Sequence, residues 1–400
     1  MRYDYVILGG GIAAAAAVEG IRSRDNEGTI LLVTRENYAP YRRSPLANEL
    51  WNGTATLDDL AMQPDSFYEE RGVRLTLRRE VVEIDPEGAR LWDDHGEVVE
   101  FGKLLMATGS RPRFLGVPGE ALAGVRYFRS LEDYLQLRRD AERLQHVLVF
   151  AGGYVGLELA PTLRATGLEV TLVHPNHCPM AHVIPHDLGK AISEHYQSLG
   201  IETLSDDLLV GFAEEHGVIL ASTRQGNTIS TQLVLADAGT VANSELAEAA
   251  GLLVGHGIEV DEFGRTTAPN VYAAGDVAEV PVLALEKRMR IESAEHAVLH
   301  GRLVGANMAG GTSPYEELPA FEANFPTVHV ASVGEVGMSL NVESVWQPPF
   351  ERGMIFYQEN ERLRGAVLWN TVDQLDWARE QIRSGKPFSR REIQEVLVKG

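Results

Sequence analysis

The sequence predicts an α/β protein with two Rossmann-like dinucleotide-binding domains, followed by a smaller α+β domain. A strand, a glycine turn and an alanine-rich helix follow one another near the N-terminus, and the same order of elements returns about 140 residues later. After residue 312 the pattern changes to short strands and one helix. With 400 residues, the chain is long enough for two or three domains.

The first unit occupies the N-terminal segment. Residues 5–8 form an apolar run that predicts a buried parallel strand, Gly9 to Gly11 predict a tight turn, and residues 12–17 predict a closely packed helix. A second strand is expected at residues 29–33. These elements, in this order within about 30 residues, are typical of a dinucleotide-binding fold.

The second unit repeats that order. Residues 146–150 predict a strand, Gly152 and Gly153 predict the turn, and residues 168–173 predict the next strand. Because this period is too long for a solenoid, it indicates two separate domains. Strands that end in small-residue turns follow at residues 103–109, 233–239 and 271–276. We therefore expect the second domain to be inserted into the first, which divides the chain into a first dinucleotide-binding domain (1–113 and 241–312), a second dinucleotide-binding domain (114–240) and a C-terminal domain (313–400).

The C-terminal region predicts antiparallel strands rather than another parallel sheet. Alternating and apolar runs lie at residues 328–333, 353–357 and 363–369, and a helix is expected near residues 374–383. Residues 112–119 contain two prolines and two glycines, which predict a linker between the first two domains.

Composition excludes several classes of function. A net charge of −21 argues against nucleic acid as a main partner and against docking on an anionic membrane. The only cysteine, Cys178, cannot form an internal disulfide, so a two-cysteine redox relay and a zinc site of several thiolates are excluded. We find no signal peptide and no apolar run of about 18 residues, and we expect a cytoplasmic protein.

The first glycine turn carries a dinucleotide fingerprint. Gly9 and Gly11 are followed by Ala14, at a position that needs only a small residue. The pyrophosphate of a dinucleotide would lie at the N-terminus of the following helix, where free N–H groups and the helix dipole favour an anion. The motif alone is common, but here it is combined with the turns at residues 107–109 and 275–276. Together the three turns predict a bound dinucleotide.

These motifs, with residues 40–51 and 291–297, resemble those of the apoptosis-inducing-factor-like and ferredoxin-reductase-type FAD-dependent pyridine nucleotide oxidoreductases, which have the glutathione-reductase-like fold. The resemblance implies FAD as cofactor, hydride from NAD(P)H, and an external acceptor: a quinone, oxygen or a small redox protein. It also implies a possible homodimer.

The resemblance further implies a set of cofactor-binding residues. For FAD they are Gly9, Gly11, Ala14, Glu36, Arg43, Val81, Ala107, Thr108, Gly109, Gly275, Asp276, Glu292, Ser293, His296 and Ala297. For NAD(P) they are Gly153, Tyr154, Gly156, His174, Asn176 and Gly239. Three of these residues have simpler explanations: Asp276 as the cap of a turn, Glu292 as a favourable first-turn acid, and His296 as an ordinary helix residue.

Departures from the family pattern cluster around the expected flavin site. Asn48 stands where the family has a lysine, so the buried carboxylate of Glu158 loses its partner and its pKa should rise through desolvation. Glu322 replaces an aromatic residue that flanks the flavin. Glu158, Asn48 and Glu322 are therefore the candidate catalytic residues. Ala151 replaces the first glycine of the second turn and is expected to crowd it.

An acidic residue usually ends the second strand of each fold and binds a ribose. The first fold has Arg35 there, with Glu36 next, whereas the second has His174, with Asn176 two residues later. His174, His177 and His182 could form a metal site or a polar rim. Their spacings give no fixed ligand geometry, so no metal is predicted.

Two functional hypotheses remain open. In the first, the protein is a working NAD(P)H-dependent flavin reductase with an altered pocket, and we expect it to be slow with nicotinamide because the lysine–glutamate pair is broken. In the second, the nicotinamide site has decayed, and the flavoprotein oxidises another small substrate or serves as a non-catalytic partner.

Overall fold

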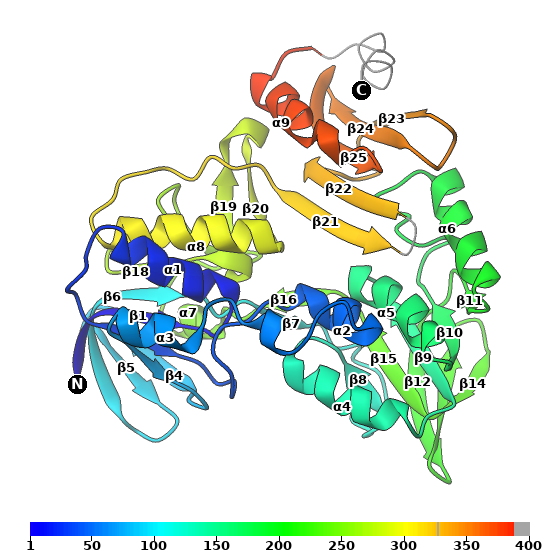
Figure 1. The fold of residues 1–400 in the computed structure, drawn as a ribbon, viewed down its shortest axis with the longest axis horizontal. Helices are drawn as coiled ribbons and strands as arrows, with labels where there is room; N and C mark the ends of the chain where they lie inside the picture. The colour runs from blue at the N-terminus through cyan, green and yellow to red at the C-terminus, as the bar shows by residue number, and fades with distance from the viewer. Residues whose placement is uncertain (326–327, 388–400) are drawn as a thin grey trace. The chain divides into compact units, whose positions relative to one another are not determined.

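The computed structural model describes residues 1–325 and 328–387, which form two compact units (Figure 1). Unit 1 comprises Met1–Arg42, Leu57–Arg111 and Ala242–Glu322. Unit 2 comprises Arg43–Thr56, Pro112–Val241 and Ala323–Gly400. The expected second and third domains thus share one unit, and their separation from each other remains a prediction.

Unit 1 is built on a mixed sheet whose order is β3-β2-β1-β6-β5-β4, with β18 also paired to β6. Strands β3, β2, β1, β6 and β18 are parallel, whereas β4 and β5 form an antiparallel extension. Their bounds are β1 (Arg2–Leu8), β2 (Ile30–Val33), β3 (Val73–Thr76), β4 (Val81–Asp85), β5 (Arg90–Asp93), β6 (Val98–Met106) and β18 (Val271–Ala273). The four residues of β2 are all buried, as expected for a strand covered on both faces.

Two helices pack against each other beside this sheet at very close range, and Figure 1 shows them side by side. They are α1 (Ile12–Arg22) and α8 (Ala294–Met308). A Cβ atom on Gly301 would lie 2.3 Å from the carbonyl oxygen of Ala13, and one on Gly305 would lie 2.2 Å from that of Ala17. Glycines on α8 and alanines on α1 therefore let the helix backbones touch, which explains why α1 is rich in alanine.

Unit 2 contains the second Rossmann-like fold. Its parallel sheet has the order β11-β10-β9-β15-β8 and is accompanied by a three-stranded antiparallel sheet, β12-β13-β14. The bounds are β8 (Val125–Tyr127), β9 (His146–Ala151), β10 (Glu169–Val173), β11 (Glu202–Leu204), β12 (Leu209–Glu215), β13 (Val218–Thr223), β14 (Thr228–Thr231), β15 (Leu233–Asp237), α4 (Leu131–Ala141), α5 (Tyr154–Ala165) and α6 (His186–Ser198). The predicted α/β class and the duplication are confirmed.

The C-terminal region forms a five-stranded antiparallel sheet with the order β21-β22-β25-β24-β23, against which α9 packs. The bounds are β21 (Ala320–Phe325), β22 (Val328–Gly334), β23 (Asn341–Trp346), β24 (Gly353–Glu359), β25 (Arg362–Trp369) and α9 (Leu375–Ser384). The three predicted strands are the inner strands of this sheet. The two outer strands were not predicted, and in β23 every residue is at least partly exposed, so this strand shows no apolar run.

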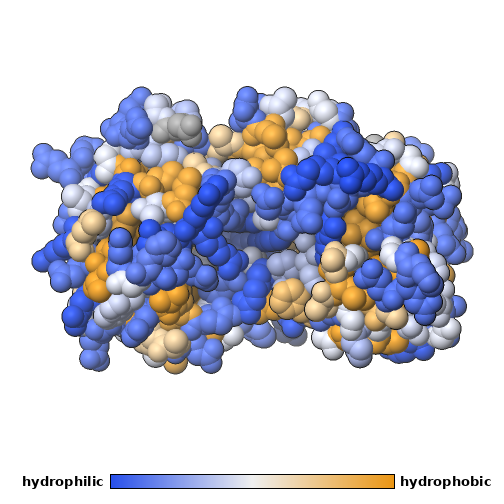
Figure 2. All heavy atoms as spheres, turned by 90° about the horizontal axis from the view of Figure 1, so that it is seen from below, coloured by the Kyte–Doolittle hydropathy of each residue, from blue (hydrophilic) through white to orange (hydrophobic). Residues whose placement is uncertain are grey.

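Short elements connect these parts. They are η1 (Ser44–Ala47), α2 (Glu49–Asn52), η2 (Asp58–Leu60), α3 (Asp65–Glu70), β7 (Ser110–Pro112), β16 (Thr240–Ala242), α7 (Glu245–Ala249), β17 (Ile258–Glu259), η3 (Gly275–Val277), β19 (Ala278–Val282), η4 (Leu283–Leu285), β20 (Lys287–Arg290) and η5 (Val372–Gln374). On the face drawn in Figure 2, hydrophilic residues surround separate hydrophobic patches. Within the described part of the chain, no helix has both the length and the apolar character that a membrane crossing requires.

Candidate functional site

The glycine turn of unit 1 brings the end of β1 against the end of β6. Gly9 has a φ of +128°, and a Cβ atom there would lie 2.0 Å from the carbonyl oxygen of Ala107. Its N–H donates to the carbonyl oxygen of Val33 at 2.8 Å. Only glycine fits this position, so the predicted turns at residues 9–11 and 107–109 meet as expected.

The N-terminus of α1 is open. Gly11 is its N-cap residue and supplies no side-chain cap, and the first turn of the helix contains no acidic residue. A Cβ atom built on Gly11 would have no neighbour within 4 Å. A helix of 11 residues with an uncapped and accessible N-terminus suits a pyrophosphate, so the residues present fit FAD.

A carboxylate follows β2 at the position where a ribose is usually bound. Glu36 is half-buried and accepts a hydrogen bond from the Tyr41 hydroxyl at 2.7 Å, whereas Arg35 is exposed. This arrangement fixes the Glu36 carboxylate, and it supports Glu36 rather than Arg35 as the ribose ligand.

The second predicted FAD segment of unit 1 joins η3 to α8. Ser293 is the N-cap residue of α8, and its hydroxyl accepts the backbone N–H of His296 at 3.2 Å. Asp276 lies 3.4 Å from the Ser110 hydroxyl, which donates to it, and Glu292 forms an ion pair with Arg290. Each polar residue of this segment thus has a local structural role, and its contact with the cofactor remains a prediction.

Two histidines of α8 are buried together. The Nδ1 atom of His296 lies 2.7 Å from the Tyr315 hydroxyl, and the Nδ1 atom of His300 accepts the N–H of Gly275 at 3.3 Å. Burial lowers the pKa of His296 well below its usual value and lowers that of His300 to about 3, so both imidazoles are neutral. This supports the structural explanation of His296. No local sequence pattern predicts the role of His300.

The glycine turn of unit 2 differs from that of unit 1. A carboxylate, that of Asp237 at the end of β15, occupies it. Its Oδ2 atom accepts the N–H of Gly156 at 2.8 Å, and its Oδ1 atom accepts that of Gly239 at 3.2 Å. A Cβ atom on Gly153, the N-cap residue of α5, would lie 2.8 Å from the Oδ1 atom.

Sequence reasoning missed Asp237. Aligning the two internal copies could have found it, because the turn at residues 107–109 begins with Ala107 where the second copy has Asp237. Ala151 does not crowd this turn as expected. It is buried, and its Cβ atom would lie 2.9 Å from a Cβ atom on Gly156, so the absence of a side chain at Gly156 makes room for it.

Glu158 lies on α5, one turn after this glycine turn. Burial, together with the negative charges of Asp237 and Glu49, raises its pKa to about 7. The predicted upward shift is therefore confirmed. Asn48, at the end of η1, is half-buried, and its Oδ1 atom accepts a hydrogen bond from Asn52 at 3.0 Å. Because η1 packs against α5, Asn48 and Glu158 belong to the same region of unit 2.

The other predicted residues are distributed over both units. Glu322 is exposed on β21 in unit 1, so its place beside Glu158 remains a prediction. Arg43 lies in unit 2 and donates to the carbonyl oxygen of Arg129 at 3.1 Å. Val81 is buried at the start of β4. Tyr154 begins α5, and burial raises its pKa.

His174 and Asn176 follow β10. His174 is buried, its Nε2 atom lies 3.2 Å from the Ser205 hydroxyl, and burial lowers its pKa. It is therefore neutral and turned inward. The backbone oxygen of Asn176 accepts the N–H of Asp206 at 2.8 Å. Neither residue brings a charge to the ribose position of the second fold.

The histidines of this region do not gather as the metal alternative required. Instead, His177 lies near Cys178 and His186, with potential ligand atoms within 4.8 Å of one another. Tetrahedral zinc with bonds of about 2.0–2.3 Å holds its ligand atoms roughly 3.3–3.8 Å apart. Cys178 is buried, whereas both histidines are exposed, and the group carries no metal assignment.

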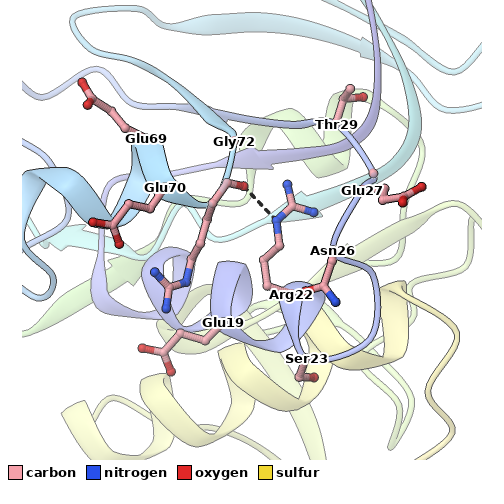
Figure 3. A pocket seen from close by; sticks show the side chains of 11 residues that line it. Glu19, Arg22, Ser23, Asn26, Glu27, Thr29, Glu69, Glu70 and Gly72 are labelled. Carbon is pink, nitrogen blue, oxygen red and sulfur yellow. Dashed lines mark hydrogen bonds between the residues drawn. The ribbon is translucent and has the colours of Figure 1, made fainter.

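Two cavities bear on the location of the site. The larger, about 860 Å³, is lined by charged and polar side chains of residues 19–29 and 69–72, and Arg22 donates to the carbonyl oxygen of Arg71 at 2.8 Å beside it (Figure 3). It lies at the C-terminal end of α1 and before β2, whereas ligands of parallel sheets bind beyond the carboxyl ends of strands. The smaller, about 30 Å³, lies at the start of α5 and is lined by Val155, Gly156 and Asp237.

Comparison with known proteins identifies similar chains. Residues 3–301 match the family described as pyridine nucleotide-disulphide oxidoreductase. Rhodocoxin reductase from Rhodococcus erythropolis is 32% identical over 79% of this chain and 74% of that protein. Mitochondrial apoptosis-inducing factor 1 from Dictyostelium discoideum is 26% identical over 99% of this chain and 80% of that protein.

A solved structure agrees with these similarities. The crystal structure of a ferredoxin reductase from Rhodopseudomonas palustris is 28% identical to this chain, covers 98% of both chains and has a TM-score of 0.91. The expected resemblance and the expected fold are therefore both confirmed.

Proposed function

Because the chain belongs to the pyridine nucleotide-disulphide oxidoreductase family, an enzyme family that uses FAD and NAD(P)H, we propose that it is a FAD-dependent reductase that takes electrons slowly from NAD(P)H and passes them to a small redox protein. The observation that carries the proposal is the open N-terminus of α1 behind the turn at Gly9. The uncapped N–H groups and the helix dipole at this end favour a pyrophosphate.

The residues of unit 1 are suited to hold FAD. Gly11 leaves room at the N-terminus of α1, and Glu36, fixed by Tyr41, offers an acceptor for ribose hydroxyls. When bound, FAD accepts a hydride and releases its two electrons to an acceptor. Glu158, with a pKa of about 7, can hold or give up a proton near neutral pH.

The names of two relatives support a protein as electron acceptor. One is a reductase of rhodocoxin, and the other is a ferredoxin reductase; ferredoxins carry iron–sulfur clusters. Although the family name refers to a disulphide, this chain has one cysteine, and Cys178 is buried. Electrons therefore leave without a thiol relay within one chain. The alternative is that the electrons pass to a quinone or to oxygen instead of a redox protein. Steady-state assays with each acceptor distinguish these possibilities.

A second candidate function is oxidation of another small substrate. It is favoured by the carboxylate of Asp237, which occupies the glycine turn of unit 2 and opposes an anionic dinucleotide there. Purified protein that is yellow and reduced by dithionite, but not by NADH or NADPH at any concentration, would favour this second function.

The FAD site can be tested at Gly11. We expect Gly11→Ala to keep the fold and to weaken FAD binding at least tenfold, because a methyl group fits the protein but points into the open space at the helix N-terminus. FAD affinity of the apoprotein is measured by flavin fluorescence, and the fold by circular dichroism. Gly211→Ala, whose new Cβ atom would lie 3.7 Å from the carbonyl oxygen of Pro118 in unit 2, is the matched control. A colourless parent protein that takes up no FAD would refute the proposal.

A further inference from the structure

We infer that Asp237 is a specificity-determining residue that closes the glycine turn of unit 2 to a pyrophosphate and thereby lowers the affinity for NADH and NADPH alike. This inference rests on the proposed function, because it concerns the electron donor of the same enzyme. It also explains why two Rossmann-like folds in one chain should differ in their affinity for dinucleotides.

The two turns differ at equivalent positions. In unit 1, a Cβ atom on Gly11 would have no neighbour within 4 Å. In unit 2, a Cβ atom on Gly153 would lie 2.8 Å from one carboxylate oxygen of Asp237 and 2.9 Å from the other. Gly11 and Gly153 are the N-cap residues of α1 and α5. The space that is open in front of α1 is therefore filled by a side chain in front of α5.

The contacts of Asp237 are those that a phosphate would use. Its two carboxylate oxygens accept N–H groups from the first turn of α5 and from the turn after β15, at Gly156 and Gly239. A carboxylate at a helix N-terminus is stabilised by the helix dipole, as a phosphate is. Asp237 thus supplies an internal anion that accepts the N–H groups of the turn and repels the pyrophosphate of a dinucleotide.

Neighbouring carboxylates strengthen this repulsion. The charges of Asp237 and Glu49 both raise the pKa of Glu158, so two further carboxyl groups, those of Glu158 and Glu49, lie in this part of unit 2. The cavity beside Asp237 measures only about 30 Å³, which is enough for a water molecule but not for a pyrophosphate. His174 is neutral and adds no positive charge at the end of β10, whereas Arg129 is the basic residue in the lining of this cavity.

The test uses Asp237→Asn and Asp237→Gly in the FAD-loaded protein, with ADP-ribose as the probe. ADP-ribose contains the pyrophosphate but cannot transfer a hydride, so affinity is measured by titration calorimetry without turnover. We expect the dissociation constant to fall at least tenfold in both variants. In Asp237→Asn the remaining oxygen can still accept the N–H of Gly156, whereas the longer contact with the N–H of Gly239 is lost. Adenosine, which lacks phosphate, should bind the parent and both variants equally.

Asp140→Asn is the charge-matched control. Asp140 pairs with Arg126 at 2.6 Å in the same unit, and its replacement should leave ADP-ribose affinity unchanged. A dissociation constant that stays the same or rises in both Asp237 variants, while their circular dichroism and FAD content match the parent, would overturn the inference. If Asp237→Gly loses its fold, Asp237→Asn decides. A parent protein that takes up no FAD would instead refute the proposed function, and the two failures are thereby distinguished.

Discussion

Asn48→Lys should raise both the flavin reduction potential and the rate at which NADH reduces the flavin. The resemblance to ferredoxin reductases places a lysine where this chain has Asn48, paired with the glutamate that corresponds to Glu158. An ammonium group about 5–6 Å from a carboxylate or a reduced flavin contributes about 3 kcal/mol at an effective dielectric constant of 20. For a two-electron couple, this energy corresponds to about 60 mV.

The structure provides the conditions for this effect. The pKa of Glu158 is raised to about 7, and the negative charge of Glu49, the residue next to Asn48, contributes to this shift. A lysine at position 48 should therefore lower the pKa of Glu158, and we expect the limiting rate at saturating NADH to rise at least tenfold. At saturating NADH, the rate no longer depends on the affinity for NADH, so this prediction is independent of the inference about Asp237.

Two control variants define the outcome. Gln136→Lys adds the same charge at an exposed position on α4 of unit 2 and should have little effect, because exposed charges are screened. Asn48→Gln changes the side chain without adding charge. If Asn48→Lys changes neither the potential nor the rate, the missing lysine does not explain the altered pocket, and another substrate near Glu158 becomes the better hypothesis.

Glu158→Gln should remove a pH-dependent loss of stability. In the unfolded chain, Glu158 titrates near its ordinary pKa of 4.5, whereas in the folded protein its pKa is about 7. Between these values the folded state holds the proton and the unfolded state does not. The stability contribution of this group is therefore fully present below pH 4.5 and is lost as the pH rises through 7. At about 1.4 kcal/mol per pKa unit, the loss amounts to roughly 3–4 kcal/mol.

The measurement compares the thermal unfolding of the parent and the variant at pH 4.5 and pH 8. The variant should be more stable than the parent at pH 8 and should show no gain in stability at pH 4.5. The difference in stability between the two proteins isolates the effect of this one carboxyl group. Glu169→Gln, at the exposed start of β10, is the control. Equal pH dependence in the parent and Glu158→Gln would show that Glu158 does not carry the shifted proton.

Local sequence patterns predict the fold class and the order of its main elements. The apolar strands of both units, their glycine turns and the inner strands of the C-terminal sheet lie where the patterns placed them, because each is determined by residues close together in the chain. The edge strand β23 was not predicted, because its residues are all at least partly exposed and alternate weakly.

The candidate site was harder to predict, because its important contacts join distant segments. Asp237 reaches Gly156, 81 residues away in sequence, and His300 accepts the N–H of Gly275, 25 residues away. Neither contact leaves a local pattern. The raised pKa of Glu158 was predicted from the missing lysine, but the part played by Asp237 required the structure. The inward position of His174 likewise depends on Ser205 in another segment.

The central claim is that this protein is a flavin reductase with an impeded nicotinamide site. The most direct test is to mix the FAD-loaded protein anaerobically with NADH and with NADPH and to record the loss of flavin absorbance. We expect slow bleaching and weak apparent affinities for both nucleotides, because Asp237 opposes the pyrophosphate that they share. The two affinities should be similar, because neither His174 nor Asn176 brings a charge that would discriminate against a 2′-phosphate. Rapid bleaching at micromolar NADH, with a preference over NADPH above about a hundredfold, or roughly 2.7 kcal/mol, would contradict the claim.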